Sequence, residues 1–217
     1  MGREVEIKLQ VKDVTRLRAA LKRMGARLAS GGTRRVHEWN AVYDTAEETL
    51  RGRQQLLRIR IETPDGAPLK RPKNAAQRAL LTFKGPDGGV RGRLGKSRGP
   101  RHKVREEIEL RVESAEALAQ IFERLGMRAA IHYEKYRTTF RLPESQRWAK
   151  RLLIELDETP IGIFVELEGP PGAIDRAAAA LGFSKKDYIL KNYLRLNAEE
   201  CRRRGVAPGD MVFTKRK

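Results

Sequence analysis

The sequence predicts an α+β fold in which a closed eight-stranded antiparallel β-barrel is flanked by helices. Two observations predict it: about eight stretches alternate charged and apolar residues with period two, and most are joined by short polar segments. In Glu4-Val5-Glu6-Ile7-Lys8-Leu9 every second side chain is charged. Because alternate side chains of a strand point to opposite faces, such strands have one charged and one apolar face. Eight antiparallel strands are enough to close a barrel around side chains or one small ligand.

The elements follow from local patterns. Strands are expected at residues 3–12, 33–45, 54–62, 80–84, 103–112, 129–142, 151–157 and 162–168. Helices are expected at 14–26 and 114–126, where apolar residues recur at intervals of three and four. Two more are expected: one opened by Pro170-Pro171-Gly172 that runs through an alanine run to Gly182, and one at 188–203. Gly25 supplies a stop for the first helix and Ser114 a cap for the second. Residues 64–78 and 85–102 are polar and basic, which predicts loops.

Composition narrows the class of protein. The net charge of +18 over 217 residues predicts an anionic partner, which could be a phosphate compound, a nucleic acid or a membrane surface. The single cysteine, Cys201, excludes an internal disulfide framework and fits a reducing compartment. The N-terminus has no apolar signal region, and no apolar stretch is long enough to span a membrane. We therefore expect a cytoplasmic protein with no membrane partner.

The charged strand faces could point outward or inward. An outward arrangement would enclose an apolar core. An inward arrangement would enclose carboxylates and guanidinium groups, which need mutual pairing, metal ions, water or an anionic ligand because unpaired buried charge is costly. In that case amphipathic helices would cover the apolar outer face. The recurrence of two or more charges on strand after strand favours the inward arrangement.

The charged side chains fall into two chemical sets. The carboxylates have no His or Cys companions and suit magnesium or manganese, whereas the cations suit phosphate oxygens. The carboxylates are Glu4, Glu6, Glu107, Glu109, Glu155, Asp157, Glu166 and Glu168. The cations are Lys8, Arg58, Arg60, Lys84, Arg105, Lys135, Arg137 and Lys191. Metal ions and cationic side chains without an evident nucleophile are typical of phosphoryl transfer by positioning and electrostatics.

An ordered series of motifs runs from residue 3 to about residue 195. It comprises Glu4-x-Glu6-x-Lys8, Tyr43-Asp44-Thr45, Leu57-Arg58-Ile59-Arg60, Thr82-Phe83-Lys84, Arg105-Glu106-Glu107-Ile108-Glu109, Lys135-x-Arg137, Leu156-Asp157-Glu158 and Phe164-Val165-Glu166-Leu167-Glu168. In this series the chain resembles the CYTH superfamily, the triphosphate tunnel metalloenzymes. The resemblance implies one triphosphate tunnel domain at residues 1–197, followed by a basic C-terminal tail at 198–217.

The resemblance also implies roles for the charged residues. The metal ligands would be Glu4, Glu6, Glu166 and Glu168, joined by Glu107, Glu109 and Asp157, and the ion would be magnesium or manganese. The triphosphate would be held by Lys8, Arg58, Arg60, Lys84, Arg105, Lys135, Arg137 and Lys191. Lys8, Lys84 and Asp157 would act in the chemical step. Replacing Glu6 or Glu168 by Gln is expected to abolish turnover with little loss of fold.

Several alternatives stay open. Family members include class IV adenylate cyclases and thiamine triphosphatases, and the phrase from Leu156 to Glu168 resembles the cyclase-like branch. We expect hydrolysis of a triphosphate such as tripolyphosphate or ATP, since it demands less of the site, and keep cyclisation of ATP as the alternative. A basic nucleic-acid-binding module is the alternative of another class, but it does not explain the paired carboxylates. The sequence leaves open whether the protein is a monomer or a homodimer.

Overall fold

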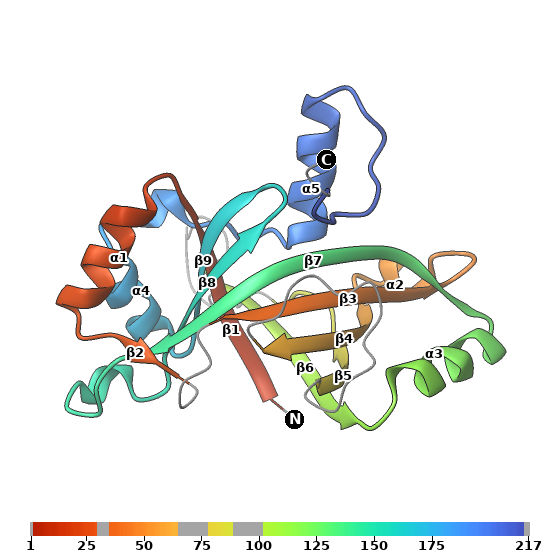
Figure 1. Ribbon diagram of the computed structural model, residues 1–217, viewed down its shortest axis with the longest axis horizontal. Helices are drawn as coiled ribbons and strands as arrows, with labels where there is room; N and C mark the ends of the chain where they lie inside the picture. Colours follow the sequence, from red (N-terminus) through yellow and green to blue (C-terminus); the bar gives the residue numbers. More distant parts are fainter. Residues whose placement is uncertain (1, 30–34, 65–77, 89–101, 215–217) are drawn as a thin grey trace, which may run out of the picture.

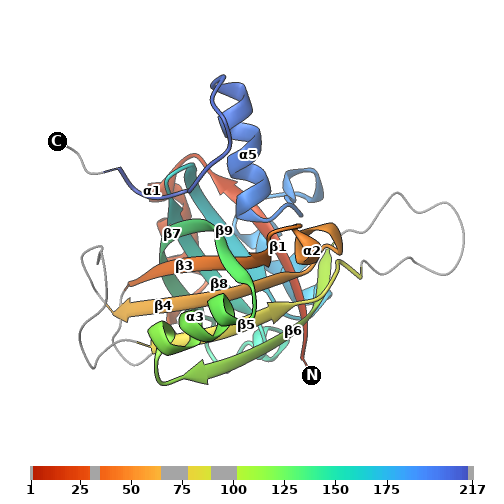
Figure 2. The same cartoon turned by 90° about the vertical axis from the view of Figure 1, so that its right-hand side faces the viewer.

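A closed antiparallel β-barrel is the centre of the molecule (Figure 1, Figure 2). The computed structural model describes residues 2–29, 35–64, 78–88 and 102–214, and over these residues nine strands form one sheet in the order β2-β7-β3-β4-β5-β6-β1-β9-β8. A further pairing of β7 with β8 closes eight of the strands into the barrel, and β2 extends the β7 edge. The predicted fold class is confirmed.

The element boundaries are mostly close to those expected. The strands are β1 (Gly2–Val11), β2 (Arg27–Leu28), β3 (Val36–Thr45), β4 (Leu56–Pro64), β5 (Arg78–Lys84), β6 (Lys103–Val112), β7 (Met127–Arg141), β8 (Leu153–Thr159) and β9 (Gly162–Glu168). The α-helices are α1 (Val14–Arg23), α2 (Thr49–Gly52), α3 (Ala115–Arg124), α4 (Pro171–Ala180) and α5 (Tyr193–Arg203), and short 3₁₀ turns lie at Arg147–Ala149 and Lys185–Asp187. The sequence did not predict β2 or α2, which are two and four residues long.

The last helix begins five residues later than residue 188, where the sequence placed its start. Ile189 exchanges backbone hydrogen bonds of 2.9 and 3.0 Å with Lys8, so this stretch continues the pairing of β1 and cannot be helical. Asn192 then caps α5, because its side chain accepts a hydrogen bond from the Arg195 amide. The sequence predicted the helix but did not reveal the competing contact of Ile189 with strand β1.

The apolar strand faces point outward, and helices cover two parts of this outer surface, whereas Ile108 and Leu110 on β6 are exposed. On one side α1 and α4 pack over β1, β8 and β9, where Ile7, Leu167 and Ile174 are fully buried. On another side α3 packs over β3 and β4 through Phe122, Tyr43 and neighbouring apolar residues. The charged faces therefore line the interior, as the consistent strand charges predicted.

The chain ends beside the barrel. Helix α5 stands over one end of the strands, and the segment that follows returns along β7, where Met211 pairs with Tyr133 (Figure 1). Residues 198–203, the start of the expected basic tail, belong to α5. The frayed end predicted at 215–217 and most of the loops predicted at 64–78 and 85–102 lie outside the described residues.

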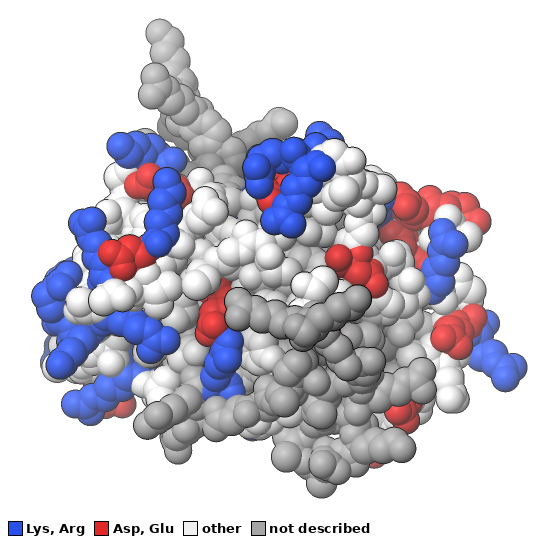
Figure 3. Space-filling view, turned by 45° about the horizontal axis from the view of Figure 1, so that its top comes forward, with Lys and Arg blue, Asp and Glu red and all other residues white. Residues whose placement is uncertain are grey.

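Positive side chains are unevenly spread over the surface. Figure 3 shows Lys and Arg gathered over the end of the molecule that carries α1, to which that helix contributes the exposed Arg16, Arg18, Lys22 and Arg23. No helix in the described part of the chain is long and apolar enough to cross a membrane.

Candidate functional site

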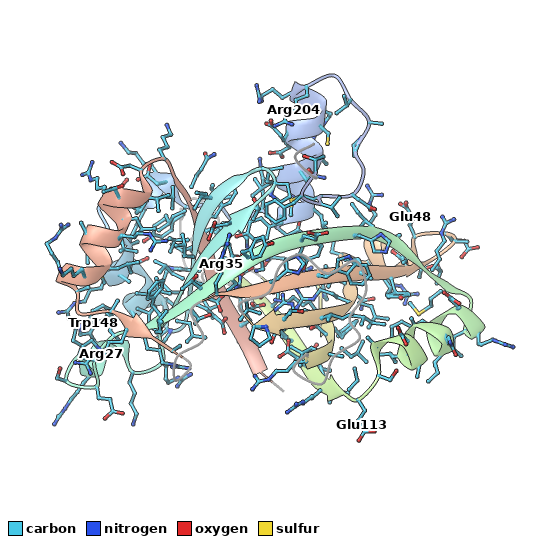
Figure 4. The ribbon with its side chains drawn as sticks, in the orientation of Figure 1. Arg27, Arg35, Glu48, Glu113, Trp148 and Arg204 are labelled. Atoms are coloured by element: carbon cyan, nitrogen blue, oxygen red, sulfur yellow. The ribbon has the colours of Figure 1, made fainter. Side chains whose placement is uncertain are left out.

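The barrel encloses a cavity of about 720 Å³ lined mainly by charged side chains. Figure 4 shows side chains crowding the space between the strands, whereas labelled residues such as Glu48, Glu113 and Arg204 lie at the periphery. Nearly all the residues predicted for the site line this cavity: Glu4, Glu6, Lys8, Arg58, Arg60, Lys84, Arg105, Glu107, Glu109, Lys135, Arg137, Glu166 and Glu168. The alternating strand pattern thus brings together residues that are far apart in sequence.

Two predicted site residues are placed differently. Lys191 does not line the cavity, since its side chain is 45% exposed and its ammonium forms a 2.8 Å ion pair with Glu199 on α5. Asp157 is fully buried beside the cavity, enclosed by the side chains that hydrogen-bond to it. Neither residue is exposed to a ligand in the cavity in this arrangement.

Strand register places opposite charges side by side at the end of the cavity where α5 begins. Lys8 on β1 lies opposite Glu166 on β9, and their side chains form a 2.9 Å ion pair. Glu6 pairs with both Lys8 and Lys103, and all three side chains are at most 8% exposed. Burial alone would raise the pKa of Glu6, but the two ammonium groups outweigh it and lower that pKa to about 2.

Asp157 is the centre of a second network. It accepts hydrogen bonds from Lys135 at 2.9 Å, from two nitrogens of Arg137 at 2.7 Å, and from the Tyr193 hydroxyl at 2.8 Å. Arg137 also forms ion pairs with Glu155 and Glu166. Because one guanidinium serves several carboxylates, burial prevails at Glu155 and raises its pKa to about 8.

Two arginines in the cavity wall differ from the other cations. Arg58 donates to the Tyr133 hydroxyl at 2.7 Å and to the Thr82 hydroxyl at 3.0 Å, and Arg105 donates to the Gln54 carbonyl oxygen at 2.5 Å. Within the described residues neither forms an ion pair with a carboxylate, and the Nε atom of each is buried without a hydrogen-bond partner. Both side chains are nearly enclosed, at 5% and 8% exposure. These two positive charges are therefore available to an anion.

A group of carboxylates toward the start of β1 is less fully neutralised. Lys84 pairs with Glu4 at 2.6 Å and with Glu107 at 3.3 Å, and its positive charge also acts to lower the pKa of Glu168. Burial, together with the negative charges of Glu4 and Glu107, raises the pKa of Glu168 to about 7. Glu168 itself forms no ion pair in the described part of the protein. Three carboxylates thus share one ammonium group.

The described residues do not form a ready metal-binding site. Over the described residues, no group of three or more Asp, Glu, His or Cys side chains is arranged so that it could hold a metal ion. Glu4, Glu6, Glu107 and Glu166 instead contact lysines or arginines. The three histidines form hydrogen bonds with Glu134, Asp175 and Asp210 and do not line the cavity.

Sequence reasoning missed several lining residues. Glu38 on β3 is 1% exposed and pairs with Arg60 at 3.1 Å, and Lys103 on β6 pairs with Glu6. The period-two pattern could have found both, because Glu38 alternates with Asn40 and Lys103 stands two residues before Arg105. The period-two pattern of charged residues does not identify Tyr133 or Tyr193, because an aromatic residue at such a position is equally typical of an apolar core.

The fold and the cavity define a closed antiparallel barrel with a charged interior, and comparison with known proteins gives the family. The model of the CYTH domain matches residues 2–192, so the chain belongs to the CYTH domain family.

Relatives share the architecture over most of their length. A protein of Methanocaldococcus jannaschii named "putative adenylate cyclase" is 26% identical over 204 residues, which cover 89% of this chain and 97% of that protein. A "putative adenylate cyclase" structure from Vibrio parahaemolyticus aligns with a TM-score of 0.65 at 19% identity, covering 89% of this chain and 96% of its own. A structure from Hippeastrum, described as a "putative adenylyl cyclase" that reveals a dominant triphosphatase activity, aligns with a TM-score of 0.54 at 16% identity, covering 94% of this chain and 96% of its own. At these identities the structural likenesses establish the fold.

Proposed function

We propose that this protein is a divalent-metal-dependent hydrolase of triphosphate compounds, which bind inside the barrel. The observation that carries the proposal is that Arg58 and Arg105 line the cavity and, among the residues that the structure describes, have no carboxylate partner. A buried guanidinium without a counter-charge is costly, so an anion in the cavity would be stabilised by both groups. Guanidinium also matches phosphate oxygens in a bidentate geometry.

The other lysines and arginines predicted for the cavity already contact carboxylates, and these contacts determine how each could bind a triphosphate. Lys8, Arg60, Lys135 and Arg137 already contact carboxylates, so they would bind phosphate oxygens as additional partners. Lys8 and Lys84 would stabilise negative charge on the transferring phosphoryl group. Asp157 would act by fixing Lys135 and Arg137, because its oxygens are occupied by their hydrogen bonds.

The donor set fits a hard divalent cation. Glu4, Glu107 and Glu168 would supply oxygen ligands, and Lys84, which pairs with Glu4 and Glu107, leaves their negative charge incompletely balanced, so magnesium or manganese could complete the charge balance there. Glu6, Glu109 and Glu166 also line the cavity, but Glu6 and Glu166 are held by lysines. When bound, the ion would neutralise phosphate oxygens and make an attacking water more acidic.

The relatives support two reactions. The Hippeastrum protein is described by a triphosphatase activity, which favours hydrolysis, whereas the names of the other two favour cyclisation of ATP. In hydrolysis a water attacks the terminal phosphorus; in cyclisation the ribose hydroxyl attacks the α-phosphorus and pyrophosphate leaves. Adenylate cyclase activity is therefore the second candidate.

One assay separates these reactions. The protein is incubated with ATP, and separately with tripolyphosphate, with Mg²⁺ or Mn²⁺, and the products are resolved by anion-exchange chromatography. Orthophosphate supports the triphosphatase, and cyclic AMP with pyrophosphate supports the cyclase. If neither substrate turns over or binds and RNA binds in a salt-sensitive way, the nucleic-acid-binding alternative gains support from the basic surface around α1.

Metal affinity is expected to fall as the pH is lowered below 7. The pKa of Glu168 is raised to about 7, so below that pH the carboxyl group is protonated and a metal ion must displace the proton. The Mn²⁺ dissociation constant, measured calorimetrically, should rise by up to about tenfold per pH unit below 7 and level off above it. Glu168→Gln should flatten this profile. An affinity of the unmodified protein that does not change between pH 5.5 and 8.5 would remove Glu168 from the ligand set.

Lys84→Met is expected to strengthen metal binding in the absence of substrate. The Lys84 ammonium contacts Glu4 and Glu107 in the position where an added cation would lie, so a metal ion competes with it. Removing the competitor should tighten Mn²⁺ binding about tenfold while weakening tripolyphosphate binding by a similar factor.

The matched control for this experiment is Lys22→Met, on the exposed face of α1. It makes the same change in charge outside the cavity and should alter neither affinity by more than about twofold. Weaker metal binding in Lys84→Met would mean that the ion binds elsewhere.

A further inference from the structure

The first residue of α5 forms part of the cavity wall. Tyr193 is 6% exposed, and its ring lies 5.1 Å from the Lys8 ammonium and 5.3 Å from the Lys135 ammonium. Its hydroxyl donates a 2.8 Å hydrogen bond to Asp157, which also accepts from Lys135. One side chain therefore contacts two of the lysines proposed to bind the triphosphate and the carboxylate that holds one of them.

The ring is itself held in place. Phe164 on β9 packs edge-on against it, with ring centroids 5.5 Å apart, and the surrounding cluster includes Val42, Tyr133 and Met211. Asn192 fixes the start of α5 through its capping hydrogen bond. Because both the ring and the helix start are anchored, the orientation of the ring is not free to follow the lysines.

An aromatic face attracts cations, and the attraction is strongest where water is excluded. Lys8 and Lys135 are each 3% exposed, so their contacts with the ring are desolvated. Two ammonium groups directed at one ligand also repel each other. A ring that attracts both lowers the cost of keeping them close together before an anion arrives.

We propose that Tyr193 is a positioning residue for the triphosphate site, whose ring holds the ammonium groups of Lys8 and Lys135 in their phosphate-binding positions. The inference rests on the proposed function and adds to it a residue that acts through the two lysines. It also assigns α5 a part in ligand binding, since this helix supplies the aromatic face.

The test varies the charge distribution of the ring at constant shape. Tyr193→Phe removes the hydroxyl and keeps the aromatic face, and 3,4,5-trifluorophenylalanine at the same position keeps the shape but weakens the negative potential of the face. Tripolyphosphate binding to the full-length protein is measured by titration calorimetry without divalent metal. We expect Tyr193→Phe to bind within about threefold of the unmodified protein, and the trifluorinated variant to bind about five- to tenfold more weakly than Tyr193→Phe.

Phe164→Leu is the matched control for packing. Phe164 belongs to the same buried cluster, and among the described contacts its ring faces Tyr193 and no cation. Tyr193→Leu and Phe164→Leu should lower the thermal unfolding temperature comparably. Only Tyr193→Leu should weaken tripolyphosphate binding by about tenfold or more.

The outcomes separate this inference from the proposed function. Equal tripolyphosphate affinities for Tyr193→Phe and the trifluorinated variant would overturn the positioning role while leaving the triphosphate site intact. Failure of the unmodified protein to bind tripolyphosphate at all would overturn both. The fluorinated comparison decides the matter even if Tyr193→Leu does not fold.

Discussion

Glu168→Gln is expected to reduce metal-dependent triphosphate turnover by about a thousandfold while the protein remains folded. Glu168 has no ion pair of its own in the described structure, and it lies beside Glu4 and Glu107. A neutral amide there removes a metal ligand and at the same time relieves repulsion between carboxylates. Loss of function should therefore occur without loss of stability.

The stability effect depends on pH in a defined direction. Burial and the neighbouring carboxylates raise the pKa of Glu168 from 4.5 to about 7, so the folded state holds this proton more tightly than the unfolded state. The free energy of unfolding contributed by Glu168 consequently falls as the pH rises from 4.5 to 7. Without metal, Glu168→Gln should be more stable than the unmodified protein at pH 8, by on the order of 1 kcal/mol after allowance for partial exposure, and not at pH 4.5. Urea unfolding in the presence of a chelator measures this difference.

Glu6→Gln provides the contrast, and here the structure changes the expectation drawn from the sequence. Glu6 pairs with Lys8 and Lys103, so the substitution leaves the Lys103 ammonium, 7% exposed, without its carboxylate. Breaking a buried pair by removing one partner costs about 3 kcal/mol or more. Both variants should be inactive, but only Glu6→Gln should be strongly destabilised. The exposed Glu113→Gln controls for the loss of a negative charge, and full turnover in Glu168→Gln would exclude this carboxylate from the metal site.

The sequence predicted the barrel and most of its lining because both follow from one periodicity. Once Glu4, Glu6 and Lys8 share a strand face, closing the sheet brings them toward Glu166 and Glu168 on the neighbouring strand. The period-two pattern does not tell whether an inward-facing side chain lines the cavity or is covered by neighbouring side chains. Asp157 stands at an inward position and is covered by Lys135, Arg137 and Tyr193.

The sequence also could not predict which arginine pairs with which carboxylate. Arg58 and Arg60 are two residues apart and were given the same role. Arg60 meets Glu38 at 3.1 Å, whereas Arg58 meets hydroxyl groups only. The difference depends on which strands are neighbours and on their register, because β3 brings Glu38 to one arginine and not to the other. Lys191 shows the same limit, since α5 offers it Glu199 outside the barrel.

Arg58→Ala is expected to weaken tripolyphosphate binding about a hundredfold without destabilising the fold. The affinity should fall because a phosphate would lose a bidentate partner that is already desolvated, at 5% exposure. Arg58→Lys should recover little of the loss, since an ammonium cannot reproduce the planar two-nitrogen contact. Stability should be maintained because, within the described part of the chain, Arg58 pairs with no carboxylate that its removal would leave unpaired.

Substitutions of two other arginines serve as controls for Arg58→Ala. Arg60→Ala leaves Glu38, 1% exposed, with fewer counter-charges and should lower the free energy of unfolding by about 3 kcal/mol, so it reports on an arginine with a structural role. Arg18→Ala, on the exposed face of α1, removes the same charge from a chain of net charge +18 and should reduce affinity only through long-range attraction. If Arg58→Ala bound tripolyphosphate as tightly as Arg18→Ala, the unpaired guanidinium would not be the anion site, and the main support for a triphosphate in the barrel would be lost.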